Sequence, residues 1–521
     1  MYQAVLTTTY LRSKIMPLLA AIGVALCTLM VLVTWSVMTG FLAMLINTGR
    51  TLAGDVSIGW PGSGFAYYDE LIADLEKDPL VEAACPKIET FGSITPPGGR
   101  PKGVLVVGVD GPRFAKATRY ESTIWWRPIS TPLPKDKHRH DPRLGGLGAS
   151  AWEAIYQNGL SLTRRDPKTG QSIPAMVPGI HVTGLNNRYR EGYYKPLVSE
   201  RRTSDGRTEI IDAFLPFDDD QPVGLTVFPI DSQGRPYEAH TRSLPVANEF
   251  QSGVYITDES LVLVNLAALQ SMLKMNEGLR VADGSAPPSP TNGESFATPQ
   301  PTKFVTDPAR VTHVILRGKG GDGDIASARA LRDRAMAVYD AFAKRHEGKV
   351  PPTSEMEFMT WEDQNATFIN AVRTERTLML FLFMIISLTA VLLVLSIFWS
   401  MVREKTQDIG VLRSMGASRA GVAWLWVSYG LAIGLVGAAL GLAGSVLIIV
   451  NINPIHDWLG EALGIVVWDP RVYYFTQIPN TVDPLDAALV FVGGVLSCGL
   501  GAMVPALRAA WMSPVAALRN E

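Results

Sequence analysis

The histidines are the first candidates for chemistry, because histidine binds metals and exchanges protons near neutral pH. His138 and His140 form a His-x-His pair in a stretch rich in Lys, Arg and Asp, where solvated side chains are far more common than a metal site. His181 and His313 lie in apolar, strand-like surroundings, which favour structural histidines. We therefore expect no metal ligand among these four residues.

Sequence motifs for catalysis are absent from the chain. It contains no G-x-x-x-x-G-K-[ST] phosphate loop, so we expect any ATP hydrolysis to belong to another polypeptide. It also contains no G-x-S-x-G elbow, no H-E-x-x-H zinc helix and no paired cysteine clusters. The prediction is a chain that is not an enzyme, has no catalytic residue and binds no cofactor of its own.

Residues 403–418, with the sequence REKTQDIGVLRSMGAS, combine charge with an apolar edge. Ile409, Leu412 and Met415 recur at helical spacing, Gly416 suits a left-handed helix end, and Ser418 suits the N-cap of a following helix. This pattern predicts a short amphipathic helix that receives a push from a partner, rather than a solvated loop. The predicted coupling residues are Arg403, Glu404, Lys405, Asp408, Ile409, Leu412, Arg413, Met415 and Gly416.

Glycines recur at alternating spacings of four and three in the apolar stretch that follows. They are Gly430, Gly434, Gly437, Gly441 and Gly444. Such spacing places them on one face of a helix, where the lack of side chains lets a second helix approach closely. The alternative, flexibility from scattered glycines, does not explain the regular spacing.

Four long blocks without charge are the dominant feature of the chain, which is 47% hydrophobic and 18% charged over 521 residues. They cover residues 15–49, 377–402, 420–455 and 487–507. Each block reaches the roughly 20 residues that a helix needs to cross a bilayer. The first block is too long for the apolar part of a signal peptide and lacks a clear cleavage site. Four transmembrane helices are therefore predicted.

The orientation is predicted from Lys and Arg, which favour the cytoplasmic side in short loops. They gather before the first span, between the second and third, and after the fourth, as Arg12, Lys14, Arg403, Lys405, Arg413, Arg419, Arg508 and Arg519. The loop at 456–486 is acidic, with Arg471 as its single basic residue. We therefore expect a multi-pass protein of a bacterial inner (plasma) membrane, with both termini cytoplasmic.

These boundaries predict nine segments along the chain. They are a cytoplasmic N-terminal segment at 1–14, helix 1 with a stalk at 15–48, an outer domain at 49–375, helix 2 at 376–402, a coupling helix at 403–419, helix 3 at 420–452, an outer loop at 453–485, helix 4 at 486–507 and a cytoplasmic tail at 508–521. The net charge of -2 and the lack of a basic stripe make nucleic acid an unlikely partner.

The outer domain reads as α+β. Strands are expected at 55–58, 81–91, 103–109, 312–316 and 356–360, and helices at 68–77 and 325–345, with a more β-rich part around 225–230 and 260–264. This order predicts two α+β units, one after helix 1 and one before helix 2. Stretches 112–143, 187–221 and 283–302 carry no clear element, and Trp125 and Trp126 are expected to pack rather than to form an exposed tip. Cys85 is the single cysteine of the domain, so no disulfide is expected there.

The 403–418 segment, the glycine-striped helix and residues 505–521, PALRAAWMSPVAALRNE, resemble the C-terminal permease domain shared by FtsX, MacB and LolC/LolE proteins. These are ABC transporter permeases of type VII. Three further matches resemble the LolC/LolE lipoprotein-releasing branch: 23–26 with 36–41, 251–255 with 261–264, and 453–458 with 472–474 and 482–486. The insertions around 112–174 and near Pro287 depart from that branch and leave a periplasmic carrier in doubt.

This resemblance implies an α-helical membrane protein with four transmembrane helices and a large α+β periplasmic domain, a MacB-like periplasmic core, inserted between helices 1 and 2. It implies a dimer with a second copy or a related permease, a separate ATPase that binds ATP and Mg, and lipid-anchored substrate proteins. A substrate cavity between helices 1 and 2 of both subunits would be lined by Met38, Phe41, Leu42, Leu45, Phe381 and Met384, for which simple contact with lipid is the alternative. Export of another amphiphile or peptide, as by MacB, and signalling to a cell-wall hydrolase, as by FtsX, stay open as other functions.

Overall fold

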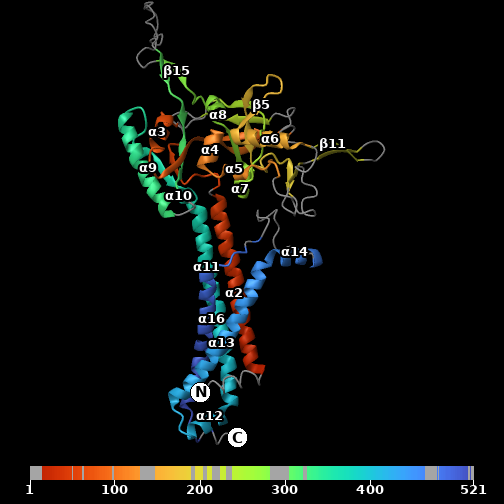
Figure 1. The fold of residues 1–521 in the computed structure, drawn as a ribbon, viewed down its shortest axis with the longest axis vertical. Coiled ribbons are helices and arrows are strands. Elements are labelled where there is room, and N and C mark those ends of the chain that lie inside the picture. Colours follow the sequence, from red (N-terminus) through yellow and green to blue (C-terminus); the bar gives the residue numbers. More distant parts are fainter. Residues whose placement is uncertain are drawn as a thin grey trace, which may run out of the picture. The chain divides into compact units, whose positions relative to one another are not determined.

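The computed structural model describes residues 15–49, 51–61, 64–96, 99–129, 147–188, 194–196, 198–202, 208–213, 223–229, 238–281, 304–320, 325–463, 478, 480–513, 515 and 517. The chain divides into two compact units. The helical unit comprises Met1–Met44, Thr367–Asp469 and Gln477–Glu521. The α+β unit comprises Leu45–Ala366 and Pro470–Thr476. Figure 1 shows the elements of both units.

Four long helices form the helical unit, and each is long and apolar enough to cross a membrane. They are α2 (Ile15–Gly49), α11 (Ala366–Glu404), α13 (Arg419–Val450) and α16 (Pro484–Trp511). Long runs of apolar residues form helices in lipid because a helix satisfies its own backbone hydrogen bonds. The four predicted helices and the α+β region between the first and second are confirmed, and the chain is a membrane protein.

Two shorter helices complete this unit: α12 (Thr406–Ser414) between α11 and α13, and α14 (Ile452–Leu463) directly after α13. Figure 1 shows α14 turning away from the axis of α13. Helix α14 occupies the first part of the segment predicted as an outer loop at 453–485. The side chain of Asn453 in α14 binds the backbone of Ile478. It accepts a hydrogen bond from Ile478 N at 2.7 Å and donates one to Ile478 O at 3.1 Å.

One nine-stranded sheet organises the α+β unit. Its main path runs β19 (Glu357–Thr360), β1 (Val56–Gly59), β18 (His313–Gly318), β3 (Val81–Thr95), β4 (Lys102–Val109), β14 (Leu261–Asn265) and β7 (Met176–Pro178). Strand β12 (Val223–Val227) pairs with both β3 and β13 (His240–Leu244). Pairing is antiparallel except between β4 and β14, which are parallel.

The two separate α+β units predicted from the sequence are wrong. Strand β1, from the first predicted unit, lies between β18 and β19, both from the second. Strand β18 in turn pairs with β3. The two ends of the domain therefore interleave in a single sheet. Strand pairing at long sequence separation leaves no local pattern, so the periodicity of each strand located it without revealing its neighbours.

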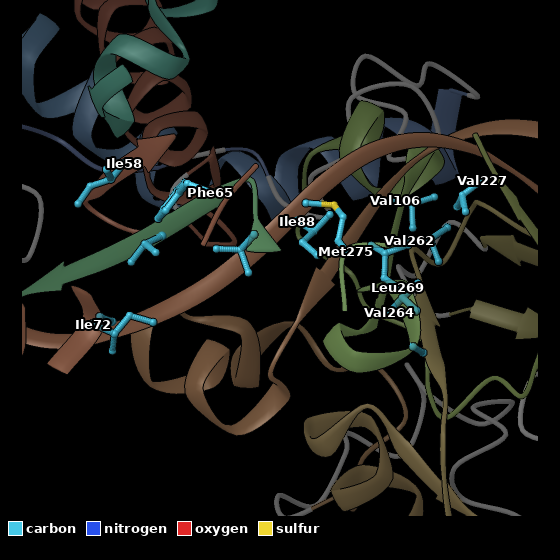
Figure 2. Close-up of a cluster of buried hydrophobic side chains, with 14 of the residues drawn as sticks. Ile58, Phe65, Ile72, Ile88, Val106, Val227, Val262, Val264, Leu269 and Met275 are labelled. Atoms are coloured by element: carbon cyan, nitrogen blue, oxygen red, sulfur yellow. The ribbon is translucent and has the colours of Figure 1, made fainter. Parts of the chain in front are cut away.

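Helices cover parts of both faces of this sheet. On one face α3 (Tyr68–Leu75), α8 (Leu266–Leu273) and α9 (Ile325–Arg345) bury a large apolar cluster. Figure 2 shows part of this cluster, with Ile58 and Ile72 at one end and Val262 and Leu269 at the other. On the other face α4 (Gly111–Ala117), α5 (Tyr120–Thr123) and α6 (Ala149–Ser161) accompany a second cluster that includes Cys85 and Phe114.

The remaining elements are short. They are β2 (Phe65–Ala66), β5 (Thr163–Arg165), β6 (Ser172–Pro174), β8 (Asn186–Arg188), β9 (Tyr194–Pro196), β10 (Val198–Arg202), β11 (Thr208–Ala213), α7 (Tyr255–Ser260), β15 (Gly278–Val281), β16 (Phe304–Asp307), β17 (Arg310–Val311), η2 (Thr353–Glu355) and α10 (Trp361–Gln364). Strands β9, β10 and β11 lie within 187–221, and helix α5 lies within 112–143, although no element was predicted in either stretch. The expected loop at 283–302 lies outside the described residues.

Trp126 packs in the interior of the α+β unit, as the sequence predicted for the tryptophan pair. Its side chain is buried and its ring lies 6.1 Å from that of Trp152 in a stacked arrangement. The ring of Trp125 meets Tyr194 edge-on at 5.0 Å. Cys85 is also buried, and burial raises the pKa of its thiol to about 12.

Candidate functional site

Helix α12 is the short helix predicted at 403–418, and it begins at Thr406 and ends at Ser414. Gly416 follows it with a φ of +96°, the left-handed conformation that glycine adopts at low cost. The Ser418 side chain then accepts a hydrogen bond from Gly421 N at 3.1 Å and caps α13. The turn between the two helices is therefore specified locally by Gly416 and Ser418.

Ile409 holds α12 against the ends of the long helices. Its side chain is 2% exposed and packs in a cluster with Val402 of α11, Val422 of α13 and Ala509 of α16. The sequence placed Ile409 on an edge offered to a partner. The structure corrects this, because the side chain is already covered by the chain itself.

Val411 and Met415 are the apolar side chains that α12 exposes instead, with exposed fractions of 46% and 78%. They are four residues apart and therefore neighbours on the helix surface. Val411 was not among the residues predicted for the apolar edge. Its spacing of four residues from Met415 is the sequence feature that could have identified it. Leu412 is half-buried.

The charged coupling residues lie along α12 and at the end of α11. Arg403, Glu404 and Asp408 are exposed, and Lys405 Nζ pairs with Asp408 Oδ2 at 2.7 Å. Arg413 is half-buried and its Nη1 donates to Ala417 O at 3.3 Å. This combination of exposed charge and exposed apolar surface at a helix is suited to binding a protein partner, and none of these groups is arranged for chemistry.

The glycine stripe of α13 lies against two other helices of the same chain. A Cβ atom at Gly430 would lie 2.6 Å from Ala502 Cβ, and one at Gly434 would lie 2.7 Å from Cys498 Cβ, both on α16. Further along, a Cβ at Gly437 would lie 2.7 Å from Ala21 O of α2. Gly441 and Gly444 likewise lie against α2, at Ala25 and Leu29. The first part of the stripe therefore packs against α16, and the second part packs against α2.

A cavity of about 260 Å³ lies between α2, α11 and α16. Apolar side chains and a few polar groups line it, among them Trp35, Phe383, Thr28, Ser497 and Asp486. The rings of Trp35 and Phe383 are 5.5 Å apart.

None of the six predicted substrate-cavity residues lines this cavity. Phe381 and Met384 are 56% and 59% exposed, on the outside of the helical unit, and Met38 and Phe41 are half-buried. The side chains of Leu42 and Leu45 lie outside the described residues. The predicted cavity would lie between two permease subunits, so it stays a prediction; within one chain it is Trp35 and Phe383 that turn toward each other.

Metal-binding chemistry finds no support in the described part of the chain, where no group of three or more His, Cys, Asp or Glu side chains could hold an ion. His181 contacts the Tyr194 hydroxyl at 3.1 Å, and His313 Nδ1 lies 2.8 Å from Thr312 Oγ1. Both are half-buried histidines with a hydrogen-bond partner. His138 and His140 lie outside the described residues.

Comparison with known proteins matches residues 380–514 to the family of FtsX-like permease C-terminal domains. This region contains α12, the glycine stripe and most of α11 and α16. The C-terminal region is therefore similar to an FtsX-like permease domain. The predicted resemblance to ABC permeases of the LolC/LolE type is also confirmed by similarity to curated proteins.

Two of these relatives are named lipoprotein-releasing system transmembrane protein LolC. The protein from Xylella fastidiosa (strain 9a5c) is 31% identical over 162 residues, 31% of this chain and 39% of the relative. That from Neisseria meningitidis serogroup B is 32% identical over 165 residues, 31% of this chain and 39% of the relative. A LolE protein from Haemophilus influenzae is 25% identical over 120 residues, 23% of this chain and 29% of the relative. The chain thus matches about two-fifths of the length of the LolC relatives.

Outside residues 380–514, one buried acidic residue, Glu249, was not singled out from the sequence. Its side chain is fully buried, and its carboxylate accepts from Trp126 Nε1 at 2.8 Å and from Asn186 Nδ2 at 2.8 Å. Burial raises the pKa of this carboxyl to about 8, although both hydrogen bonds oppose the rise. A buried Glu has no local sequence signature when its partners are 63 and 123 residues away.

Replacing Glu249 should change how stability depends on pH. A carboxyl whose pKa is raised in the folded state favours folding only while it is protonated, so stability should fall as the pH rises from about 4.5 to about 8. We expect Glu249→Gln to remove this fall. The unfolding temperature of the variant, relative to that of the wild type, should therefore increase as the pH rises across that range. Unfolding of the full chain in detergent, followed by tryptophan fluorescence, measures the difference. Parallel pH profiles for the two proteins would contradict the expectation.

Proposed function

We propose that this chain is the permease subunit of an ABC transporter that uses a separate ATPase to release lipid-anchored proteins from the bacterial inner membrane. The FtsX-like permease domain at 380–514 carries the proposal, together with the similarity to LolC proteins. The α+β unit would be the periplasmic, MacB-like part. ATP and Mg would bind to the partner ATPase, and a second copy or a related permease would complete a dimer.

The packing around α12 supports a mechanical role. Ile409 shares a buried cluster with one residue from each of α11, α13 and α16, so a displacement of α12 would be passed to these membrane helices. The close contacts of the glycine stripe join α13 to α16 and α2 through backbone and small side chains, which deform little. We infer that ATPase closure would push on Val411 and Met415 and move the four helices as rigid levers.

Release of a lipid-anchored protein tests this function directly. The chain and its ATPase would be reconstituted into proteoliposomes with a triacylated protein, and soluble protein would be measured after ATP addition. ATP-dependent release above that from liposomes without the chain is expected. Release that is equal in the absence of the chain, with an active ATPase present, would overturn the proposal.

The proposed orientation places both termini and α12 in the cytoplasm. Residue 407 is exposed on α12 and Met336 is exposed on α9, so cysteines placed there report on opposite sides. In intact spheroplasts an impermeant maleimide should label Met336→Cys and leave Gln407→Cys unmodified until the membrane is opened. Labelling of position 407 in intact spheroplasts would contradict the proposed orientation. The natural Cys85 is unsuitable as a reporter because it is buried.

A further inference from the structure

One face of the sheet in the α+β unit is only partly covered, and the open part forms a cleft of about 1000 Å³. Alternate residues of β3 point to this face: Cys85 is buried in the cluster with α4 and α5, whereas Lys87, Glu89 and Phe91 line the cleft. Leu105 of β4 and His313 of β18 extend the same surface. The cleft is therefore the continuation of a packed sheet face beyond the helices that cover it.

The floor of the cleft holds an ion pair. Lys87 Nζ lies 2.6 Å from Glu89 Oε1, with the Lys87 side chain 9% exposed and that of Glu89 34% exposed. Glu89 N donates to Thr312 Oγ1 at 2.9 Å, and Thr312 contacts His313. Burial lowers the pKa of His313 to about 4, so this ring is neutral at physiological pH. The floor thus offers both donors and acceptors at fixed positions.

Apolar side chains surround this polar floor. Phe91 is 76% exposed, Phe228 is 42% exposed and Met359 is 37% exposed, and all three line the cleft. Large side chains of this kind are normally covered in a soluble domain, and a group of them beside convergent polar groups is typical of a binding site. Lys274, Arg310 and Glu357 also line the cleft, so charges of both signs are present.

We propose that this cleft binds an extended segment of polypeptide. A peptide backbone supplies N–H groups that can pair with Glu89 and C=O groups that can pair with Lys87, while its side chains cover Phe91 and Phe228. A hydrocarbon chain would withdraw Lys87 and Glu89 from water without replacing the hydrogen bonds that they do not make to each other, which is unfavourable. A nucleic acid would need a basic surface, and the charges of this cleft are mixed.

If the proposed function holds, the bound segment would be the polypeptide that follows the lipid anchor of the released protein. That identity rests on the proposed function, but the cleft's affinity for extended polypeptide does not. Binding and release can therefore be measured separately, on the same purified protein. A chain that binds polypeptide but releases no lipid-anchored protein would uphold this inference and overturn the proposed function.

The test uses the full chain in detergent and fluorescent, reduced and carboxymethylated α-lactalbumin, a permanently unfolded polypeptide. Fluorescence anisotropy should show saturable binding. Phe91→Ser and Phe228→Ser should each weaken it by about tenfold, because each removes an exposed aromatic contact. Met336→Ser, on the exposed surface of α9, is the matched control and should leave binding unchanged. All three positions are solvent-exposed, so folding should be retained, which melting temperatures would check.

Three outcomes would overturn the inference. The first is no saturable binding by the wild type, and the second is an equal effect of the Phe91 and Met336 substitutions. The third comes from a dansylated fatty acid: if it binds in a manner that depends on Phe91 and displaces the polypeptide, the cleft is a lipid site. Polypeptide binding that depends on Phe91 and Phe228 and is unaffected by the fatty acid would support the inference.

Discussion

Met415→Asp is expected to separate this chain from its ATPase while leaving the permease itself intact. Met415 is 78% exposed in the isolated chain, so an aspartate is readily solvated there and should not disturb folding. In the proposed complex it would place a carboxylate in a desolvated contact without a partner. That costs roughly 3 kcal/mol, or about a hundredfold in affinity. Copurification of the ATPase with the tagged chain, and ATP-dependent release, should both be lost.

Three further variants distinguish a lost contact from a general effect. Met415→Leu keeps an apolar side chain and should retain the ATPase. Val515→Asp introduces the same charge at an equally exposed site, 73%, beyond α16 and should have little effect. Ile409→Asp should instead lower the yield of folded protein, since its side chain is buried among α11, α13 and α16. If Met415→Asp retained the ATPase as the wild type does, α12 would not be the coupling element.

Leu412→Asp would be the choice from the sequence alone, and the structure shows why it is less informative. Leu412 is half-buried, so a carboxylate there would affect both the folding of α12 and its contact with a partner. The sequence predicted that a helix exists at this place and where it ends. It did not predict which of its apolar residues the chain itself would cover.

Across the molecule, features set by local sequence were predicted better than features set by contacts between distant residues. Local features were predicted well: α9 spans Ile325–Arg345, as the amphipathic pattern indicated, and the four apolar helices follow from blocks without charge. Features that depend on long-range contacts were not. The position of β1 between β18 and β19, the inward turn of Trp35 and Phe383 and the burial of Glu249 each require knowledge of a partner far along the chain.

Gly→Ala substitutions at Gly437, in the glycine stripe, and at Gly493, in α16, are expected to have opposite effects on stability. At Gly437 a Cβ atom would lie 2.7 Å from the carbonyl oxygen of Ala21, a backbone atom that cannot move without shifting α2. At Gly493 of α16 a Cβ would meet nothing within 4 Å. Alanine favours a helix over glycine by about 1 kcal/mol, so Gly→Ala should stabilise where space is available.

We therefore expect opposite signs for the two variants. Gly437→Ala should lower the unfolding temperature of the detergent-solubilised chain, because overpacking costs about 1 to 3 kcal/mol and exceeds the gain in helix propensity. Gly493→Ala should leave the unfolding temperature unchanged or raise it. Gly437→Leu, which adds more atoms at the same contact, should prevent recovery of a monodisperse protein. Equal unfolding temperatures for the two alanine variants would mean that α13 and α2 do not approach as closely as the stripe requires, and the rigid link proposed between α12 and the outer end of the helical unit would fail with it.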